Sequence, residues 1–498
     1  MAGASATALL SRVGRAEPTG VVEVTLREDA TMPAVPGDFM GLSYELAQLT
    51  DPGFFSAKNR ELVEYFRLLS PSGVLRLGGN TSEFCWFRAT EATAAPKLRV
   101  PAGDLKANWM PHQLFAIEPR AIDELAGFLK ATGWRLIYGL NFGNSTPERA
   151  AEEAAYVAKA VGERLEYFQM GNEPDLYTQA NNGTRPADWS FVDYVEEWTD
   201  RARAIGARVA AARFGGPDVA ASSDWVLRFN KTVGGESLTA LTGHYYAEGP
   251  PDDPKVTIAR LLGGNAKVAN ETAEIVAAAK AERRVYRMTE GNSCYRGGKP
   301  GMSDAFAAAL WASDYLLTLA VHGAAGANLH GGQSRFLTAG LGGHTPGMDV
   351  AKGPQTMPSG YYTPIRSEPG TAMRAMPVFY GMLVAQQLAG ATMLRCERST
   401  TPDQDAAVYA GRTKKETLVA LINKGEAVDV ALRGVKGARR GRVWRLEGPR
   451  LDATEGVTLG GAEIGADGKW SPGAEDVEVG EAVRLHLPAA SGAVVFLS

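Results

Sequence analysis

The sequence predicts an α/β protein, a (β/α)8 TIM barrel with a C-terminal antiparallel β-sandwich, and three observations favour this fold. From residue 39 to residue 388, apolar strand-like runs alternate with helix-like segments, which is the pattern of a parallel barrel. Beyond residue 388 the helical pattern stops, and short alternating runs follow between clusters of Gly, Asp and Pro. The chain of 498 residues is also too long for a single compact core.

These patterns divide the chain into three parts. Residues 36–388 form the expected barrel, and residues 389–498 form the expected sandwich. Residues 18–30 precede the barrel but contain the alternating run GVVEVTLR, which is typical of a half-buried strand. We expect this run to pair with the C-terminal sheet, so that the smaller domain is built from both ends of the chain.

Eight short apolar runs predict the barrel strands, and most of them are followed by a helix-like segment. The last run differs from the others because it consists mainly of small residues. The predicted strands cover residues 39–45, 73–79, 135–142, 165–173, 212–218, 238–246, 284–290 and 323–330.

Amphipathic or alanine-rich segments predict the helices between these strands. Residues 147–161 begin with a proline, which suits the first turn of a helix, and are rich in alanine. Residues 303–322 carry an apolar stripe. The predicted helices cover residues 59–69, 120–130, 147–161, 191–205, part of 258–280, 303–322 and 376–388.

The C-terminal part reads as a series of short strands separated by turn residues. Alternation of apolar and polar residues over five or six positions predicts strands with one buried face. The predicted strands cover residues 393–397, 406–410, 417–422, 428–432, 442–446, 482–487 and 493–497.

Composition argues against several classes of function. The net charge is −4, from 52 basic and 56 acidic residues, which argues against a polyanion-binding surface and so against a nucleic-acid partner. No apolar run approaches the ~20 residues that span a bilayer, so we expect no membrane partner. No C-x-x-C, HExxH or EF-hand spacing occurs, and we predict neither a metal nor a cofactor. The sequence indicates no particular oligomeric state.

The first residues bear on the compartment. Residues 1–20 are weakly apolar and lack a basic stretch before their apolar centre, so they do not read as a signal peptide. We expect a secreted or periplasmic protein whose signal has been removed, and a cytoplasmic start stays open. Three cysteines are too few and too scattered for a disulfide framework: Cys85, Cys294 and Cys396.

Two glutamates follow strand-like runs at matching points of the barrel pattern. The run LEYFQMGNEPDLY at 165–177 contains Glu173, and the run RVYRMTEGN at 284–292 contains Glu290. Catalytic residues of barrel enzymes lie at the C-terminal ends of the strands. Retaining hydrolysis of a glycosidic bond needs two carboxyl groups about 5–5.5 Å apart, one protonated and one ionised. Glu173 alone would read as a surface acid, but the matching Glu290 indicates a catalytic pair.

We assign Glu173 as the acid/base and Glu290 as the nucleophile. Asn172 projects differently from its neighbour Glu173, so we expect its amide to bond the 2-hydroxyl group of the sugar.

This arrangement resembles the retaining glycosidases of clan A, and within that clan glycoside hydrolase family 79, which contains β-glucuronidases and heparanase-like enzymes. The motifs that carry the resemblance are GNEPDLY at 171–177, MTEGNSCY at 288–295, GLSYE at 41–45, LRLGGN at 75–80 and YYTPI at 361–365. The resemblance covers the chain from about residue 18 to its end. It implies a retaining exo-β-glucuronidase acting on terminal glucuronic acid, with or without a 4-O-methyl group.

The resemblance also implies roles for residues on other strand ends. Glu45 and His330 would bond sugar hydroxyls, although a solvated acid and a packed structural histidine are the alternatives. His244 and Tyr246 share one face of their strand because side chains alternate, and Tyr246 would bond Glu290. Arg76 would pair with Glu290 and keep it ionised.

A glucuronide carries a carboxylate, for which the resemblance supplies donors in Tyr295, the backbone amide of Arg296 and Tyr362. Two departures from the family pattern concern these donors. Family members have glycine where this chain has Arg296, whose side chain either reaches an acidic substituent or points into solvent. A long insert at 333–360 precedes Tyr362; we expect it to wall the pocket, with Phe336 as an alternative wall residue.

Several other functions stay open on the residues alone. A β-glucosidase-type exo-glycosidase would keep the mechanism and change the sugar. A heparanase-like endo-β-glucuronidase would need a basic cleft, and the strand-end loops carry no strong Lys/Arg run. A non-catalytic carbohydrate-binding protein is disfavoured by the two glutamates. Cys294 has no His-plus-acid pattern around it, so we interpret it as a packed small residue.

Overall fold

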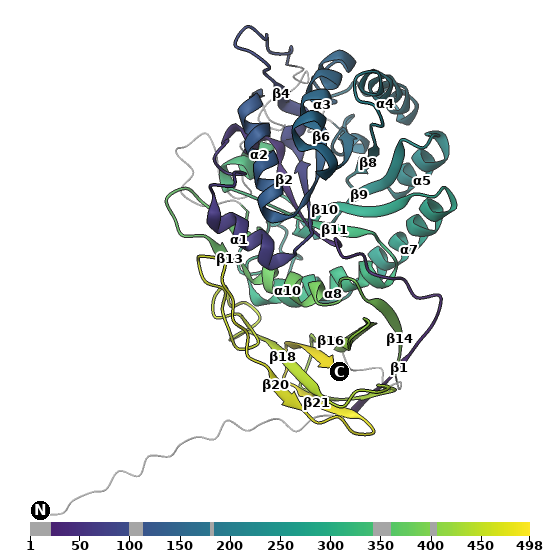
Figure 1. Ribbon diagram of the computed structural model, residues 1–498, viewed down its shortest axis with the longest axis vertical. Coiled ribbons are helices and arrows are strands. Elements are labelled where there is room, and N and C mark those ends of the chain that lie inside the picture. Colours follow the sequence, from purple (N-terminus) through teal and green to yellow (C-terminus); the bar gives the residue numbers. More distant parts are fainter. Residues whose placement is uncertain (1–20, 99–112, 180–183, 342–359, 399–405) are drawn as a thin grey trace, which may run out of the picture.

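Eight parallel strands close into a barrel in the computed structural model, which describes residues 21–98, 113–179, 184–341, 360–398 and 406–498 (Figure 1). Around the barrel the strands follow the order β10-β11-β2-β3-β6-β7-β8-β9. Their bounds are β2 Met40–Glu45, β3 Val74–Gly78, β6 Arg135–Leu140, β7 Leu165–Met170, β8 Phe214–Val219, β9 Leu238–Glu248, β10 Val285–Cys294 and β11 Gly326–Gly331. All eight predicted barrel strands are present, and the predicted fold class is confirmed.

Helices cover the outside of this barrel (Figure 1). Their bounds are α1 Arg60–Leu69, α2 Pro119–Thr132, α3 Pro147–Val161, α4 Phe191–Gly206, α5 Ser223–Thr232, α6 Ile258–Leu261, α7 Ala266–Ala281, α8 Phe306–Val321, α9 Ser334–Gly340 and α10 Pro377–Gln386. The sequence prediction omitted α5, a short helix between β8 and β9 that buries only Val226, Phe229 and Asn230. The single helix predicted within 258–280 is two helices, α6 and α7, separated by residues that include Gly263 and Gly264.

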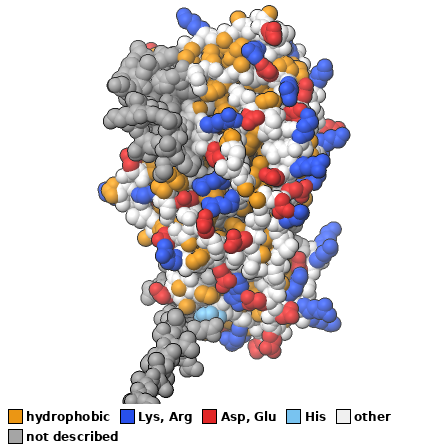
Figure 2. All heavy atoms as spheres, turned by 90° about the vertical axis from the view of Figure 1, so that its left-hand side faces the viewer, with side chains coloured by type: hydrophobic (Ala, Val, Ile, Leu, Met, Phe, Trp, Pro, Cys, Tyr) orange, Lys and Arg blue, Asp and Glu red, His pale blue; other side chains and the backbone are white. Residues whose placement is uncertain are grey.

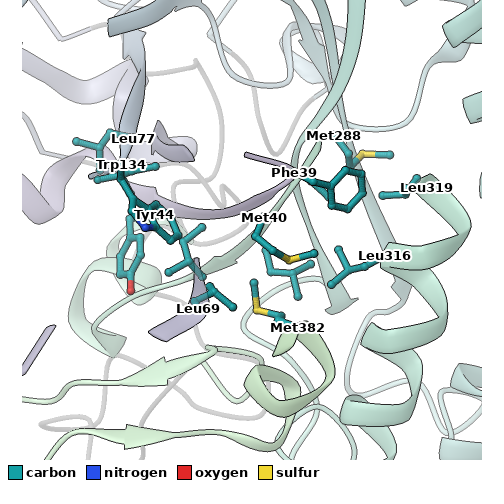
Figure 3. Close-up of a cluster of buried hydrophobic side chains, with 14 of the residues drawn as sticks. Phe39, Met40, Tyr44, Leu69, Leu77, Trp134, Met288, Leu316, Leu319 and Met382 are labelled. Atoms are coloured by element: carbon teal, nitrogen blue, oxygen red, sulfur yellow. The ribbon is translucent and has the colours of Figure 1, made fainter. Parts of the chain in front are cut away.

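The barrel core fills the space between strands and helices with large side chains (Figure 3). Phe66 on α1 packs against Phe128 on α2 and Trp134 before β6, with ring centroids 4.9 and 4.5 Å away. On the other side, Leu316 and Leu319 of α8 lie near Met288 of β10 (Figure 3). Because this core lies outside the strands, the inward-facing residues are free to carry polar side chains.

The C-terminal strands form one curled sheet. Its strands are β1 Val21–Arg27, β14 Thr392–Arg398, β15 Ala406–Arg412, β16 Thr417–Asn423, β17 Val428–Arg433, β18 Gly441–Glu447, β19 Thr458–Leu459, β20 Glu475–Val477, β21 Val483–Leu487 and β22 Ser491–Leu497. Side chains from β1, β17 and β21 share one buried cluster with those from β15, β16 and β22, so the sheet folds over its own core as a sandwich does.

The N-terminal strand β1 lies inside this sheet, between β14 and β17. Figure 1 shows it beside β14. It runs antiparallel to β14 and parallel to β17, which is an exception to the antiparallel pattern that we expected. The strand therefore pairs with the C-terminal part of the chain, as expected from its alternation. The division into residues 18–30, 36–388 and 389–498 stays a prediction.

Helices α8 and α10 lie between the barrel and the curled sheet (Figure 1). Helix α8 is buried along almost its whole length, and Asp314 near its centre faces the sheet. The Asp314 carboxylate accepts hydrogen bonds from the Tyr409 hydroxyl at 2.7 Å and from the Lys424 ammonium group at 2.9 Å. Apolar packing and these two hydrogen bonds thus join the barrel to the curled sheet.

Acidic and basic side chains are interspersed on the face shown in Figure 2. Among the described residues, none of the helices is long and apolar enough to span a membrane. Residues 1–20, on which the expected compartment depends, lie outside the described residues, and the compartment stays a prediction.

Candidate active site

The two predicted catalytic glutamates come together at the C-terminal mouth of the barrel. Glu173 follows β7 with left-handed backbone angles, φ 54° and ψ 51°, which are unfavourable for a residue with a Cβ. Its backbone N–H donates to the carbonyl of Asp218 at 2.9 Å, which holds this turn in place. One carboxylate oxygen of Glu173 lies within 4.8 Å of one of Glu290. The two side chains are thus close enough to act on one bond.

Backbone bulges aim the side chains at this mouth. The pairing of β10 with β9 skips Thr289, so that Glu290 lies opposite His244, and β10 continues to Cys294 beyond the expected end. The pairing of β8 with β9 likewise skips Asp218. Bulges re-aim side chains and are frequent beside active sites.

Glu290 is held as a carboxylate. Its oxygens accept hydrogen bonds from Arg76 Nη1 at 2.5 Å and from the Tyr246 hydroxyl at 2.8 Å, the two contacts expected from the sequence. Burial alone would raise the pKa of Glu290, but the charges on His330, His244 and Arg76 outweigh it and lower that pKa to about 2. Glu290 is therefore ionised at neutral pH.

Glu173 has the opposite electrostatic environment. Burial is the largest influence on its carboxyl group and raises the pKa, and the nearby charge of Glu290 raises it further. His244 Nδ1 lies 3.1 Å from Glu173 Oε1 and partly offsets this increase. The two glutamates thus have pKa values displaced in opposite directions, which is the pattern of an acid paired with a nucleophile.

Beneath the glutamates lies a buried ionic cluster centred on Asp218, a residue to which the sequence analysis gave no role. Asp218 Oδ2 accepts from Arg76 Nη2 at 2.5 Å, and Oδ1 accepts from the Thr289 hydroxyl and the Gln169 amide, each at 2.5 Å. Its Oδ1 also lies 3.2 Å from His244 Nε2. Asp218 thus anchors the two cations that face the glutamates.

The same cluster sets the charge of His244. Burial alone would lower the pKa of His244, but the carboxylates of Asp218 and Glu290 raise it to about 10. His244 is therefore an imidazolium at neutral pH. Glu173, His244 and Glu290 form the one group of described residues whose spacing would suit a metal ion. Because His244 and Arg76 already supply positive charge, ion pairing explains this group better than a metal does.

A cavity of about 410 Å³ opens above the glutamates and is large enough for a small ligand. Of the residues predicted to contact substrate, six line it: Glu45, Tyr246, Tyr295, Arg296, His330 and Tyr362. Asn172 is the exception: it is not among the lining residues, and its side chain is bonded to Arg76 and Asn80. Lining residues that the sequence analysis did not name include Asn80, Leu176, Gln179 and Leu337.

Glu45 and His330 form one side of this cavity. Glu45 Oε2 accepts hydrogen bonds from the Thr81 amide at 2.8 Å and the Thr81 hydroxyl at 2.6 Å. His330 lies 3.6 Å from carboxylate oxygens of both Glu45 and Glu290, and its Nδ1 is 3.0 Å from the Ser43 hydroxyl. Gly79 has φ 68°, and a Cβ there would lie 2.5 Å from the Glu45 carboxyl carbon, so glycine is required.

Three tyrosines form another side. The Tyr246 ring lies with its centroid 6.5 Å from that of Tyr295 and 6.1 Å from that of Tyr362. Tyr362 reaches the cavity because the backbone amides of Gly360 and Tyr361 donate to the carbonyl of Gly297, at 3.1 and 2.7 Å. The end of the insert is therefore tied to the turn after β10. Tyr245, between His244 and Tyr246 on β9, lies on the opposite face of the strand and stacks on Tyr315.

Only part of the insert at 333–360 is described, because residues 342–359 lie outside the described residues. Within its described part, Leu337 and Leu341 line the cavity. Phe336, the alternative wall residue, belongs instead to the barrel core. The reason is that Phe336 and Leu337 are adjacent on α9, where neighbouring side chains point about 100° apart.

Cys294 is buried, and burial raises the pKa of its thiol to about 12. A thiol that stays protonated is a poor nucleophile, in agreement with the packed residue that we expected.

Comparison with known proteins places this geometry in context. No protein-family model matches the chain. A β-glucuronidase from Aspergillus niger is 27% identical over 342 residues, and one from Neurospora crassa is 26% identical over 357 residues. Each alignment covers 63% of this chain and 61% of the relative, so the chain matches about three-fifths of their length.

Solved structures agree on the fold. A 4-O-α-L-rhamnosyl-β-D-glucuronidase from Fusarium oxysporum superposes with a TM-score of 0.71 at 17% identity, covering 96% of this chain and all of that one. A GH51 arabinofuranosidase from Xanthomonas axonopodis superposes with a TM-score of 0.64, also at 17% identity, with 96% of this chain and all of that one covered.

The chain has the fold of these solved structures, and its two carboxyl groups lie together at the mouth of the barrel. In sequence the chain is similar to the two fungal β-glucuronidases, and the resemblance to β-glucuronidases inferred from the sequence is confirmed. Membership of family 79 in particular stays a prediction.

Proposed function

We propose that the protein is a retaining exo-β-glucuronidase that removes terminal β-linked glucuronic acid, with or without a 4-O-methyl group, from glycans or glycoconjugates. The observation that carries this proposal is the pair of glutamates at the barrel mouth, whose carboxylate oxygens lie within 4.8 Å and whose pKa values are displaced in opposite directions. The relationship to β-glucuronidases supports the choice of sugar.

In the first step, the Glu290 carboxylate attacks the anomeric carbon while Glu173 donates its proton to the leaving oxygen. Arg76 and Tyr246 orient Glu290 through both of its oxygens. The separation below 4.8 Å supports a retaining mechanism, because inverting enzymes need room for a water molecule between carboxyl groups about 6.5–9.5 Å apart.

In the second step, a water molecule attacks the glycosyl ester of Glu290, and Glu173 accepts the proton from that water. Esterification removes the negative charge of Glu290, which had raised the pKa of Glu173. The imidazolium of His244, 3.1 Å away, then stabilises ionised Glu173. The same residue therefore serves first as acid and then as base.

A neutral sugar is the second candidate, and one observation favours it. The carboxyl groups of Glu45 and Glu290 line the cavity and would repel an acidic sugar. A β-glucosidase-type activity would avoid this repulsion. An endo-acting, heparanase-like enzyme draws no such support from the described cavity wall.

The test compares 4-nitrophenyl β-glucuronide with 4-nitrophenyl β-glucoside, with the product anomer followed by proton NMR in the first minutes. We expect cleavage of the glucuronide with release of the β-anomer. Cleavage of the glucoside alone would replace the proposed sugar, and first release of the α-anomer would rule out retention.

Replacing Glu173 by Gln is expected to change the pH profile. In the wild type, kcat/KM should rise as pH passes the Glu290 pKa of about 2 and fall as pH passes the raised pKa of Glu173, because Glu173 then loses its proton. The variant should lose the alkaline limb and about 10²- to 10⁴-fold of activity on alkyl glucuronides, whose poor leaving groups need protonation.

Activated aryl glucuronides provide the control. Their leaving groups need no proton, so glycosylation of the Glu173→Gln variant should stay near the wild-type rate in a pre-steady-state burst. An unchanged alkaline limb in the variant would assign the acid to another residue.

A further inference from the structure

The turn after β10 carries a cation on the wall of the cavity. Arg296 and Tyr295 both line the cavity, and the Arg296 guanidinium carbon lies 5.6 Å from the centre of the Tyr295 ring. Among the described lining residues, Arg296 is the one with a guanidinium or ammonium group. A cation over an aromatic face is held in a defined position without losing its charge.

The backbone at this turn would suit glycine better than arginine. Arg296 has φ 57°, and Gly297 and Gly298 continue the left-handed turn with φ 86° and 85°. Left-handed angles are unfavourable for a residue with a Cβ, and such strain often occurs at functional sites. We therefore expect the side chain of Arg296 to have a function whose benefit offsets this strain.

The charges around the cavity indicate what this function is. Of the three carboxyl groups on the cavity wall, those of Glu45 and Glu290 would repel an anionic sugar. Arg76 and His244 do not line the cavity, whereas Arg296 does. A cation on the wall itself, where Arg296 lies, would compensate for this repulsion.

We propose that Arg296 binds the carboxylate of the bound sugar and sets the preference of the site for a uronic acid over its neutral analogue. This inference rests on the proposed function. Guanidinium and carboxylate groups match as paired hydrogen-bonding planes. The hydroxyl groups of Tyr295 and Tyr362, on the same wall, would complete the anion site.

The test replaces Arg296 by Gly and compares 4-nitrophenyl β-glucuronide with the corresponding glucuronamide, which is neutral and nearly identical in shape. The ratio of kcat/KM for acid to that for amide should fall by about 10- to 100-fold, mainly through KM. The thermal midpoint should stay the same or rise, because glycine suits φ 57°.

Arg283→Gly is the matched control. Arg283 also has φ 57°, is exposed, and precedes the opposite end of β10. Its replacement changes the net charge and the backbone in the same way, and it should leave the acid-to-amide ratio unchanged. Arg296→Lys should keep part of the preference, because it retains the charge without the planar fork.

An acid-to-amide ratio in Arg296→Gly equal to that of the wild type would overturn the inference, whether the two activities stay the same or fall by the same factor. A loss confined to glucuronides with a carboxylated aryl group would also overturn it, because the anion bound would then belong to the aglycone. A wild type that cleaves the glucoside and neither glucuronide nor glucuronamide would instead contradict the proposed function.

Discussion

Replacing Glu290 by glycine is expected to slow hydrolysis of an aryl β-glucuronide by about 10⁴-fold or more, because the nucleophile is lost. Sodium azide should restore turnover, since a small anion can occupy the space of the missing carboxylate. The restored product should be the α-glycosyl azide, because azide would attack from the face that Glu290 occupies. Proton NMR of the product measures its anomeric configuration directly.

Glu173→Gly is the matched comparison, because it removes the same kind of side chain from the opposite face of the bound sugar. With an activated aryl substrate, Glu290 would still form the glycosyl ester, and azide should then give the β-glycosyl azide. Opposite products from the two variants would establish both assignments. A β-azide from the Glu290 variant would exchange the two roles, and an unimpaired Glu290→Gly variant would move the chemistry elsewhere.

Replacing Arg76 by Met is expected to lower the free energy of unfolding by about 3–5 kcal/mol, because it leaves buried carboxylates without their cation. Arg76 contacts Asp218 and Glu290, each at 2.5 Å, and all three side chains are at most 7% exposed. Urea denaturation at pH 7 measures the change. The double variant Arg76→Met/Asp218→Asn should recover part of the loss, because it removes one of the uncompensated charges.

The pH dependence of stability supplies a second measurement on the same variant. In the wild type, Glu290 has a folded pKa of about 2, below the ordinary value of 4.5, so it stabilises the fold above pH 4.5 and this contribution is lost toward pH 2. Without Arg76 the pKa of Glu290 should rise, and the gain of stability across this range should shrink. If the dependence of stability on pH were unchanged in the variant, solvent or other residues would already screen the charge of Glu290 from Arg76.

The sequence predicted the barrel strands because buried parallel strands are apolar and short, and this pattern depends little on their partners. Helix α5 was missed for a physical reason. It buries only Val226, Phe229 and Asn230, so its apolar periodicity is too short to be distinguished from a loop. The parallel pairing of β1 with β17 could not be predicted, because pairing direction depends on the path of the whole chain.

At the site, the sequence predicted residues whose position after a strand is recognisable, such as Glu173 and Glu290. Asp218 ends a predicted strand in the same way, and that position was a usable signal. Its role became clear only from contacts with Arg76 and His244, which come from β3 and β9. Ion pairs between distant strands leave no spacing in the chain, so the sequence alone could not assemble the cluster.

The place of β1 within the sheet has a consequence for biosynthesis. This strand is made before the barrel, yet its neighbours β14 and β17 leave the ribosome more than 360 residues later. Until then, Val21–Arg27 has unpaired edges and an apolar face, the features that make a nascent segment prone to aggregate or to recruit chaperones. Once inserted, the same strand holds the sheet together, because opening the sheet at this point requires the N-terminal strand β1 to separate from the C-terminal strands β14 and β17.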